Sequence, residues 1–444
     1  MIELVLPSDI WETLRTRLLV GPEETCAIIF ARQVTRRDGL VRLLVREVEL
    51  PTSDDYTHRG CTEAELKPEV VARVTKRARL EDYSITFVHS HPGSSPPFFS
   101  DVDDDGEAQL SAFLARRHPN LLHAAMVVSK GGARARRLGT ANEISVLSLG
   151  AIRDVLFDPQ AKPHTASEMF DRQIRAFGAT GQKLLGRLRF GIVGLGGTGS
   201  LVAQQLAHLG VQNFLLIDPD TLEATNLNRV VGAKPQDIGS SKVDVAERMI
   251  QSINPAALIE RVQGDVIYAR TATSLVNVDV IFGCTDSHGS RSILQQVAYQ
   301  YLIPYFDVGT VLAVSDSGVT HISGQARLLA PGLACHTCCG FLNPEEVRRD
   351  LMTPFERQAD PYIVGMHEPA PAVISINSTT TSLAVTMLLS VALGVPGAAR
   401  HVLYDGIKPA LRAIRAIPDP NCYICSRKGV LAQGDAWPLL ARQD

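Results

Sequence analysis

The feature that most constrains the fold is a glycine-rich turn between a short apolar run and an amphipathic segment. Phe190–Val193 reads as a buried strand, and Leu201–Leu209 has helical periodicity that stops at Gly210. The turn between them contains Gly194, Gly196, Gly197 and Gly199. Glycines let the backbone approach a phosphate, and the N-terminus of a helix offers free N–H groups. Because strand, G-x-G-x-x-G and helix occur together, we predict a nucleotide site rather than a structural turn.

The charged residues after the turn indicate a triphosphate rather than a dinucleotide. The next strand, Phe214–Ile217, ends in Asp218, at the distance where a ribose-binding carboxylate is expected. Arg229 and Lys242 follow. Hydride transfer does not need these cations, whereas phosphoryl chemistry needs them to neutralise moving charge. The pattern therefore argues against an NAD-dependent dehydrogenase.

Three pieces of this region, D-x-D, N-L-N-R and K, resemble the superfamily of ubiquitin-activating enzymes and of the ThiF and MoeB adenylyltransferases. The resemblance covers roughly residues 168–426. It implies a Rossmann-like, doubly wound α/β domain that uses ATP and Mg²⁺. It also implies that Asp218 and Asp220 hold the ribose and its surroundings, and that phosphates are contacted by Asn226, Arg229 and Lys242.

Two further segments extend this resemblance. Phe282–Asp286 resembles the family's strand-end C-T-D, whose aspartate, here Asp286, binds magnesium. Asp171–Ile174 resembles the family's R-Q segment, whose arginine reaches into the site of the neighbouring subunit. That arginine would be Arg172, and the resemblance therefore implies a homodimer.

A second motif follows the strand expected at Ser84–Val88. His89 and His91 would lie on one face, because side chains alternate along a strand, and two imidazoles suit zinc. The spacing H-S-H-P, seven residues, S-x-x-D, which ends at Asp103, resembles the JAMM (JAB, MPN+) metalloproteases. These enzymes cut isopeptide or peptide bonds after ubiquitin-like proteins.

The JAMM resemblance implies that a catalytic zinc is bound by His89, His91 and Asp103, with water in the fourth position. Glu23 and Glu24 are both candidates for the family's upstream glutamate. Glu24 matches better because it directly precedes Thr-Cys, and it would carry the water's proton to the leaving amine. Ser100 would help to hold the carbonyl oxygen. No element of the motif is missing, so an active protease is expected rather than a relic.

Two C-x-x-C pairs near the end of the chain predict a tetrahedral zinc site, with ligands Cys335, Cys338, Cys422 and Cys425. The adenylating family places its structural zinc with the same wide separation. Gly340–Pro371 would be the family's crossover loop, where many members carry a cysteine that takes the acyl group as a thioester. No cysteine lies between Cys339 and Cys422. Cys339 is the one candidate near the loop, and we expect it to pack beside the metal instead.

Length and composition suggest the organisation of the chain. With 444 residues, two domains are expected. We place a JAB-like α/β metalloprotease domain at 1–155 and the adenylation domain at 156–444, because the stretch 150–167 lacks periodicity. The basic segment Gly131–Arg137 is expected to be a turn or exposed loop. Alternating strands and helices after residue 188 predict a parallel sheet.

Charge, hydropathy and cysteine usage bound the surroundings of the protein. A net charge of -3 gives no support for nucleic-acid or anionic-membrane binding. The apolar stretch Val373–Leu393 is interrupted by Asn377 and a run of hydroxyl residues, which favours a buried core helix over a membrane span. No signal-peptide pattern opens the chain. The paired cysteines indicate metal rather than disulfides, so a cytoplasmic location is expected.

Three functional hypotheses follow. In the first, a bifunctional enzyme adenylates the C-terminus of a ubiquitin-like protein and also cleaves at that C-terminus, with a conjugating-type transfer enzyme as a further partner. In the second, the partner is a sulfur carrier whose adenylate becomes a thiocarboxylate, which the missing loop cysteine favours. The third is a non-catalytic nucleotide-binding scaffold, against which the complete motifs argue.

Overall fold

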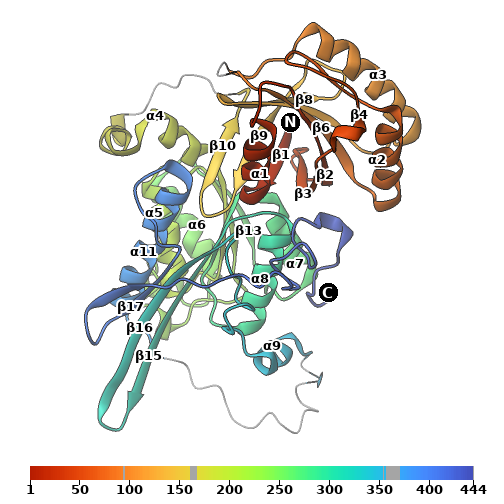
Figure 1. Ribbon diagram of the computed structural model, residues 1–444. Helices are drawn as coiled ribbons and strands as arrows, with labels where there is room; N and C mark the ends of the chain where they lie inside the picture. Colours follow the sequence, from red (N-terminus) through yellow and green to blue (C-terminus); the bar gives the residue numbers. More distant parts are fainter. Residues whose placement is uncertain (94–95, 161–167, 354, 357–370, 444) are drawn as a thin grey trace. The chain divides into compact units, whose positions relative to one another are not determined.

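The computed structural model describes residues 1–93, 96–160, 168–353, 355–356 and 371–443. Two compact units emerge (Figure 1). The first comprises Met1–Lys162, Gln300–Leu302 and Val430–Pro438, and the second comprises Pro163–Tyr299, Ile303–Gly429 and Leu439–Asp444. The predicted boundary at residue 155 lies inside strand β10 (Arg153–Phe157), whose backbone pairs with β9, so the first unit extends past it.

The first unit is built on one eight-stranded sheet with the order β1-β3-β2-β6-β7-β8-β9-β10. A further parallel pairing of β1 with β9 closes the sheet on itself. Its strands are β1 (Ile2–Pro7), β2 (Cys26–Thr35), β3 (Val41–Glu49), β6 (Ser84–His91), β7 (Ala124–Ser129), β8 (Gly132–Arg137), β9 (Glu143–Leu149) and β10. A separate small sheet is formed by β4 (Tyr56–Arg59) and β5 (Ala64–Leu66).

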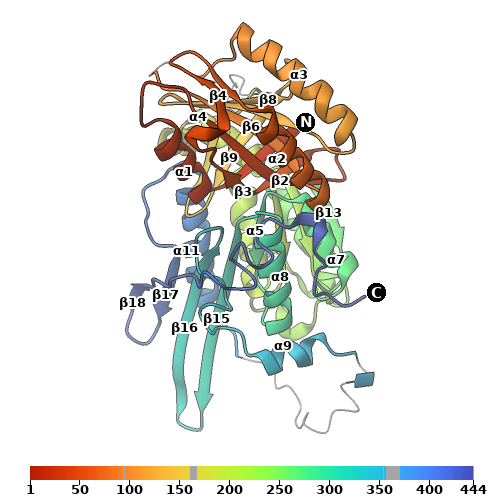
Figure 2. The ribbon, with the colours of Figure 1, turned by 45° about the vertical axis from the view of Figure 1, so that its right-hand side comes forward.

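Period-two alternation gives this sheet two buried faces. Along β2, Ala27 and Ile29 belong to one apolar cluster, whereas Ile28 and Phe30 belong to the other. Helix α1 (Ser8–Leu18) contributes side chains to the first cluster. Helices α2 (Pro68–Glu81) and α3 (Asp101–Arg117) contribute to the second and lie together in Figure 2.

The segment Gly131–Arg137 was expected to be a hairpin turn or exposed loop: Gly131 lies in the turn between β7 and β8, but the rest is strand β8, so the loop prediction is wrong for Gly132–Arg137. Ala133 and Ala135 are buried, while Arg134 and Arg136 alternate with them and pair with carboxylates. Alanine and arginine alternate in this segment, as expected for a strand, but alanine is a weak signal of burial and the three arginines indicate an exposed segment.

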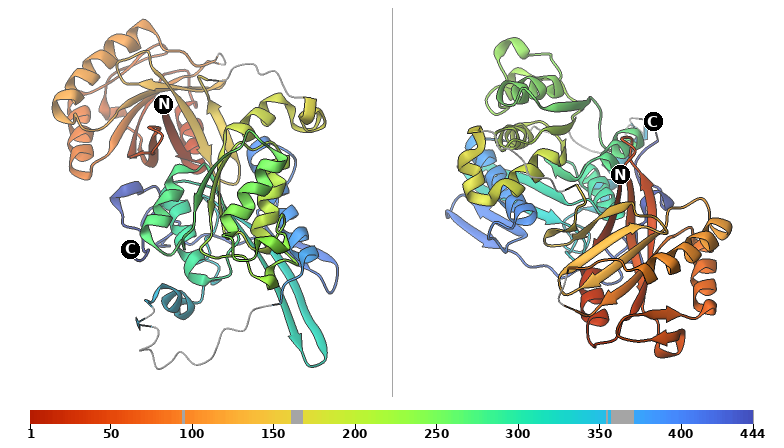
Figure 3. Two further views of the ribbon diagram at one scale, coloured as in Figure 1. Left: turned by 180° about the vertical axis from the view of Figure 1, so that it is seen from behind. Right: turned by 90° about the horizontal axis from the view of Figure 1, so that it is seen from above.

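The second unit contains another eight-stranded sheet, ordered β13-β12-β11-β14-β15-β16-β17-β18. The strands β13, β12, β11, β14 and β15 are parallel, as predicted, whereas β15 through β18 are antiparallel. The bounds are β11 (Arg189–Val193), β12 (Asn213–Ile217), β13 (Leu258–Val262), β14 (Val280–Gly283), β15 (Tyr305–Ser315), β16 (Gly318–Leu329), β17 (His401–Asp405) and β18 (Ala410–Ala413). The β15–β16 hairpin is long and is seen from behind in Figure 3.

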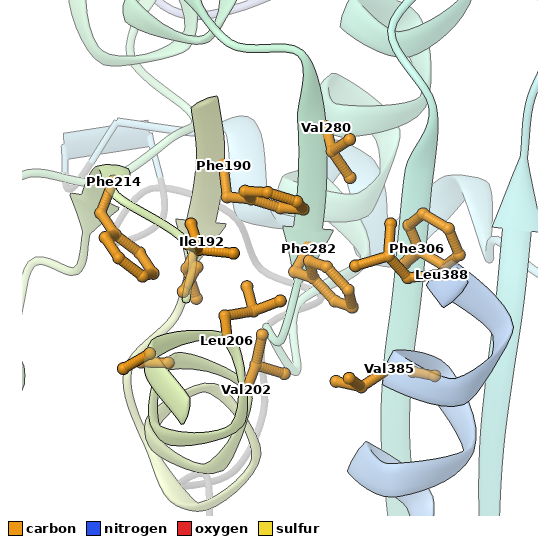
Figure 4. Close-up of a cluster of buried hydrophobic side chains, with 14 of the residues drawn as sticks. Phe190, Ile192, Val202, Leu206, Phe214, Val280, Phe282, Phe306, Val385 and Leu388 are labelled. Carbon is orange, nitrogen blue, oxygen red and sulfur yellow. The ribbon is translucent and has the colours of Figure 1, made fainter. Parts of the chain in front are cut away.

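Helices pack on both faces of this sheet, as expected for a doubly wound fold. The described helices of the second unit are α4 (Asp171–Arg187), α5 (Gly197–His208), α6 (Lys242–Ile253), α7 (Ala269–Ser274), α8 (His288–Gln300), α9 (Pro344–Leu351) and α11 (Ile374–Leu393), of which α9 has no buried residue. On one face, Phe190 and Ile192 of β11 meet α5, and Phe282 stacks on Phe306 with ring centroids 5.0 Å apart (Figure 4). On the other face, Leu294 of α8 lies against Gly283.

Helix α11 is a core element of the second unit. Its side chains Val385 and Leu388 join the same apolar cluster as α5 and β14 (Figure 4). Among the described residues, this is the one helix long and apolar enough to cross a membrane by length and composition. Its packing agrees with the prediction of a buried core helix.

Candidate functional sites

The glycine-rich turn is held close to two backbone segments. Gly194 has a φ of +85°, and a Cβ on it would lie 2.7 Å from the carbonyl oxygen of Cys284. A Cβ on Gly199 would lie 1.8 Å from the carbonyl oxygen of Gly194. In contrast, a Cβ on Gly196 would meet nothing within 4 Å. Gly194 and Gly199 therefore close the turn, while Gly196 leaves open space at the start of α5.

The predicted ribose carboxylates differ in their surroundings. Asp218, at the end of β12, is 3% exposed and accepts backbone hydrogen bonds from Leu195 (2.6 Å) and Asp220 (2.9 Å). Burial raises the pKa of Asp218, while Lys242 and the two backbone bonds act in the opposite direction. Asp218 thus shapes the glycine turn, and the exposed Asp220 is the more accessible carboxylate.

The predicted phosphate-binding cations lie near the turn. Nζ of Lys242 is 2.6 Å from Oδ2 of Asp220 and 3.9 Å from Oδ1 of Asp218. Arg229 donates to the carbonyl of Thr225 at 2.6 Å, and its Cγ and Cδ lie 3.3 Å from where a Cβ on Gly197 would sit. The structure therefore brings Arg229 to Gly197 of the turn and Lys242 to the two carboxylates that follow β12.

Three other predicted residues are placed less directly. Asn226 is buried and accepts the backbone N–H of Glu223, so it folds the local 3₁₀ turn η3 (Ala224–Asn226). Asp286 is exposed in the loop after β14, two residues past Cys284, which abuts the glycine turn. Arg172 is exposed on α4 and makes no hydrogen bond or ion pair within the described part of the chain.

One residue near the turn was not predicted as functional. Asn377 of α11 is 3% exposed, and its Nδ2 lies 2.3 Å from where a Cβ on Gly197 would sit. In the sequence, its one signal is a polar side chain that interrupts an apolar helix.

In the first unit, the predicted catalytic zinc ligands converge. Atoms of His89, His91 and Asp103 lie within 4.8 Å of one another. His89 and His91 end β6, and Asp103 stands in the first turn of α3. Nε2 of His89 is buried and 3.1 Å from Oδ1 of Asp103, yet it has no hydrogen-bond partner among the described residues. An unpartnered buried imidazole nitrogen beside a second imidazole and a carboxylate fits a zinc ion.

Glu24 and Ser100 complete this cluster in different ways. Oε1 of Glu24 lies 3.5 Å from Nε2 of His91. Burial raises the pKa of Glu24 to about 7, although the nearby His89 lowers it. Ser100 caps α3, and its hydroxyl donates to Oδ2 of Asp103 at 2.8 Å. The single hydroxyl proton of Ser100 thus orients the predicted ligand Asp103 instead of facing a substrate carbonyl.

The electrostatics of Asp103 follow from these contacts. Burial raises the pKa of its carboxyl, but His89 and the hydrogen bonds from Ser100 outweigh burial and bring the pKa below its usual range. Asp103 is therefore held as a carboxylate, the form that binds a metal.

The four predicted structural ligands also meet in space. Sγ of Cys335 lies 3.7 Å from Sγ of Cys338 and 3.5 Å from Sγ of Cys422. Sγ of Cys338 lies 3.4 Å from Sγ of Cys425. The hydrogen bond with Cys425 is the main cause that lowers the pKa of Cys335 to about 5. Four converging thiols without a disulfide could hold zinc.

Cys339 stands apart from this cluster. Its Sγ accepts a hydrogen bond at 2.8 Å from Nη2 of the buried Arg327 on β16. The predicted crossover loop, Gly340–Pro371, falls partly outside the described residues, at 354 and 357–370.

Comparison with known proteins agrees with both halves of the chain. The model of the ThiF family matches residues 170–424, and the model of prokaryotic homologs of the JAB domain matches residues 8–139. Molybdopterin-synthase adenylyltransferase of Escherichia coli K12 is 28% identical over 262 residues, which cover 58% of this chain and 96% of that protein. SAMP-activating enzyme E1 of Haloferax volcanii is 26% identical, over 57% of this chain and 86% of that protein. Ubiquitin-like modifier-activating enzyme 5 of Arabidopsis thaliana is 31% identical over a shorter stretch, 33% of this chain and 36% of that protein.

Proposed function

Because the chain belongs to the ThiF family, by a match over more than half its length, we propose that its second unit adenylates the C-terminus of a small ubiquitin-like or sulfur-carrier protein with ATP. The relatives named as adenylyltransferases and activating enzymes support this activity. The observation that carries the proposal is the open space beside Gly196 at the start of α5. Arg229 lies against the neighbouring Gly197, and Lys242 contacts Asp218 and Asp220 at the end of β12.

In this reaction, a carboxylate oxygen of the partner attacks the α-phosphorus of ATP. A new C(O)O–P bond forms, the bond from the α-phosphorus to the bridging oxygen breaks, and pyrophosphate leaves with that electron pair. The N–H groups at the start of α5 would orient phosphate oxygens. Arg229 and Lys242 would neutralise the charge that moves to the leaving group.

Asp286 would hold Mg²⁺ beside the phosphates, since one exposed carboxylate plus phosphate oxygens is a usual environment for that ion. Mg²⁺ would supply further neutralisation of phosphate charge. Arg172, exposed on α4, would act in the site of a second copy, which makes the active form a homodimer.

We further propose that the first unit is a zinc peptidase that acts at the C-terminus of the same partner. His89, His91 and Asp103 would hold the ion, which would supply Lewis-acid activation of the reacting water and carbonyl. Glu24, 3.5 Å from His91, would take the proton of the attacking water and give it to the leaving amine. Ser100 would donate a hydrogen bond to the substrate carbonyl only after its hydroxyl rotates away from Oδ2 of Asp103.

The fate of the acyl adenylate depends on whether a thioester forms. The sequence has no cysteine between Cys339 and Cys422, and Cys339 is engaged by Arg327. These facts favour direct transfer from the adenylate, either to a sulfur donor or to a conjugating-type partner, over a thioester on this chain.

The decisive experiment uses the full chain, ATP, Mg²⁺ and a ubiquitin-like or sulfur-carrier protein as the partner. Pyrophosphate exchange and adenylated partner, detected by intact mass, are expected for the wild type and lost in Asp286→Ala. A thiol-sensitive adduct on the enzyme that disappears in Cys339→Ala would show a thioester instead. No exchange by the wild type with a partner of proven folding would contradict the adenylation proposal.

A second arm tests the peptidase with a partner precursor that carries a C-terminal extension. Wild-type protein is expected to release the extension and then to support pyrophosphate exchange. Glu24→Gln should block exchange with the precursor while leaving exchange with the mature partner unchanged. Equal exchange with both substrates by Glu24→Gln would separate the two activities and contradict a processing role.

A further inference from the structure

The start of α5 carries a polar group whose purpose the packing of the protein does not explain. Asn377 comes from α11, about 180 residues after the turn, and is 97% buried. Its Oδ1 accepts a hydrogen bond from Oγ1 of Thr310 at 3.0 Å. Because the oxygen is fixed by Thr310, the amide nitrogen points the other way, toward Gly197.

The amide nitrogen lies where a side chain at Gly197 would otherwise sit. A Cβ on Gly197 would be 2.3 Å from Nδ2 of Asn377, and 3.3 Å from the Arg229 side chain. Nδ2 itself has no hydrogen bond to the described residues of the chain, and it is not among the fully enclosed side-chain atoms that lack a partner. A ligand at the turn can therefore reach it and supply its acceptor.

The contacts of α11 keep this amide in place. One turn after Asn377, the hydroxyl of Thr381 donates to the carbonyl of Thr198 in α5 at 3.4 Å. Thr381 is fully buried, so the two helices are tied at the point where α5 begins. The Asn377 amide is therefore fixed relative to the free N–H groups of the turn.

We propose that Asn377 is an anion-binding residue of the adenylation site, whose Nδ2 donates a hydrogen bond to an anionic oxygen held at the N-terminus of α5. This proposal rests on the proposed adenylation function. The anionic oxygen belongs either to a phosphate of ATP or to the C-terminal carboxylate of the partner, since both must meet at this point. Near Gly197, Arg229 supplies charge and Asn377 supplies a neutral, rigid donor.

The test compares two substitutions on α11. Asn377→Asp keeps the size of the side chain and the Thr310 hydrogen bond, but it replaces the donor with a negative charge. Ser382→Ala is the matched control, because Ser382 also contacts α5, through Gln205 at 3.0 Å, away from the turn. Affinities for ATP and for adenosine, KM for the partner in pyrophosphate exchange, and melting temperature are measured for both variants and the wild type.

We expect Asn377→Asp to weaken ATP binding by about tenfold or more without changing adenosine binding, if a phosphate is the acceptor. If the acceptor is the partner carboxylate, ATP affinity stays constant and KM for the partner rises by about tenfold or more. Either result supports the proposal, provided that Ser382→Ala behaves as wild type.

Unchanged ATP affinity and unchanged partner KM in a folded Asn377→Asp protein would overturn the proposal and leave the adenylation function standing. A wild type that binds no ATP would overturn both. Should Asn377→Asp fail to fold, Asn377→Ser, which is smaller and uncharged, gives the same discrimination, because its hydroxyl is too short to reach the anion above Gly197.

Discussion

The glycines of the nucleotide turn offer a prediction that separates folding from ligand binding. Gly199→Ala would place a Cβ 1.8 Å from the backbone oxygen of Gly194, and backbone cannot rotate away as a side chain can. The start of α5 and the turn must therefore move apart. Gly196→Ala, three residues earlier, adds a methyl group with nothing within 4 Å, so its cost comes from the backbone alone, whose φ of -72° and ψ of -148° lie outside the regions that alanine favours.

The magnitudes follow from this contrast. Overpacking of a tight backbone contact costs about 3 kcal/mol, so Gly199→Ala should lower the melting temperature of the second unit by roughly 6–12 °C. Gly196→Ala should lower the free energy of unfolding by less, about 1–2 kcal/mol, because only its backbone angles are unfavourable. Its methyl group would occupy the open space in which a phosphate is expected, so ATP affinity should fall by about tenfold or more.

Calorimetry follows the unfolding transition of the second unit, and isothermal titration measures ATP affinity for each variant. The reasoning fails if Gly196→Ala destabilises the protein as much as Gly199→Ala does. It also fails if Gly196→Ala is stable and binds ATP like the wild type, because the open space at Gly196 would then have no ligand to admit.

Three further predictions test the other sites. Glu24→Gln should keep the zinc of the first unit but slow cleavage of a C-terminally extended partner by about 100-fold or more. His89→Ala should contain about one zinc per chain less than the wild type by elemental analysis. Equal zinc in both variants would contradict the predicted ligand set. Cys335→Ser should lose a different zinc and lower the melting temperature, and a variant with full zinc would exclude the four-thiol site. Asp307→Asn, which breaks the buried pair with Arg291 (3.0 Å), should cost about 3 kcal/mol or more at pH 7. Burial raises the pKa of Asp307, but Arg291 and its other partners bring it below the usual value. The stability is therefore present above about pH 4 and lost below it, and urea unfolding at pH 7 and pH 3 should show the gap between wild type and Asn variant shrink.

What the sequence could predict was local. The glycine turn, the two histidines and the cysteine pairs are each written in a few neighbouring residues, and the strand and helix periods that place them are short-range. His89 and His91 share a face because side chains alternate along β6, and Asp103 joins them because Ser100 begins α3 three residues earlier. The structure brings together what these short patterns implied.

What the sequence could not predict depends on long-range packing. Asn377 reaches Gly197 because α11 packs beside α5, and no local pattern contains that contact. The antiparallel half of the second sheet arises because the β15–β16 hairpin reverses the chain after the parallel strands. In the same way, the two partners of Asp218, which make it part of the turn, are backbone groups that a motif does not specify.

The two sites are built on opposite physical principles, and this bears on how they could serve one partner. The nucleotide turn consists mainly of glycines, so its affinity for phosphate would come from backbone N–H groups and from the long cationic side chains Arg229 and Lys242 of other segments. The predicted metal site is the reverse, since it is made of partly buried side chains from β6 and α3 and of the buried Glu24, which is 6% exposed and lies before β2. Chemically, cleavage of an amide at a C-terminus yields the free carboxylate that adenylation consumes. The first unit could therefore produce the substrate of the second, but adenylation cannot supply the peptidase unless an amine later captures the acyl group. A chain that carries both activities would thus process before it activates, whereas cleavage of a conjugate, which uses only water, first requires that an amine has captured the acyl group.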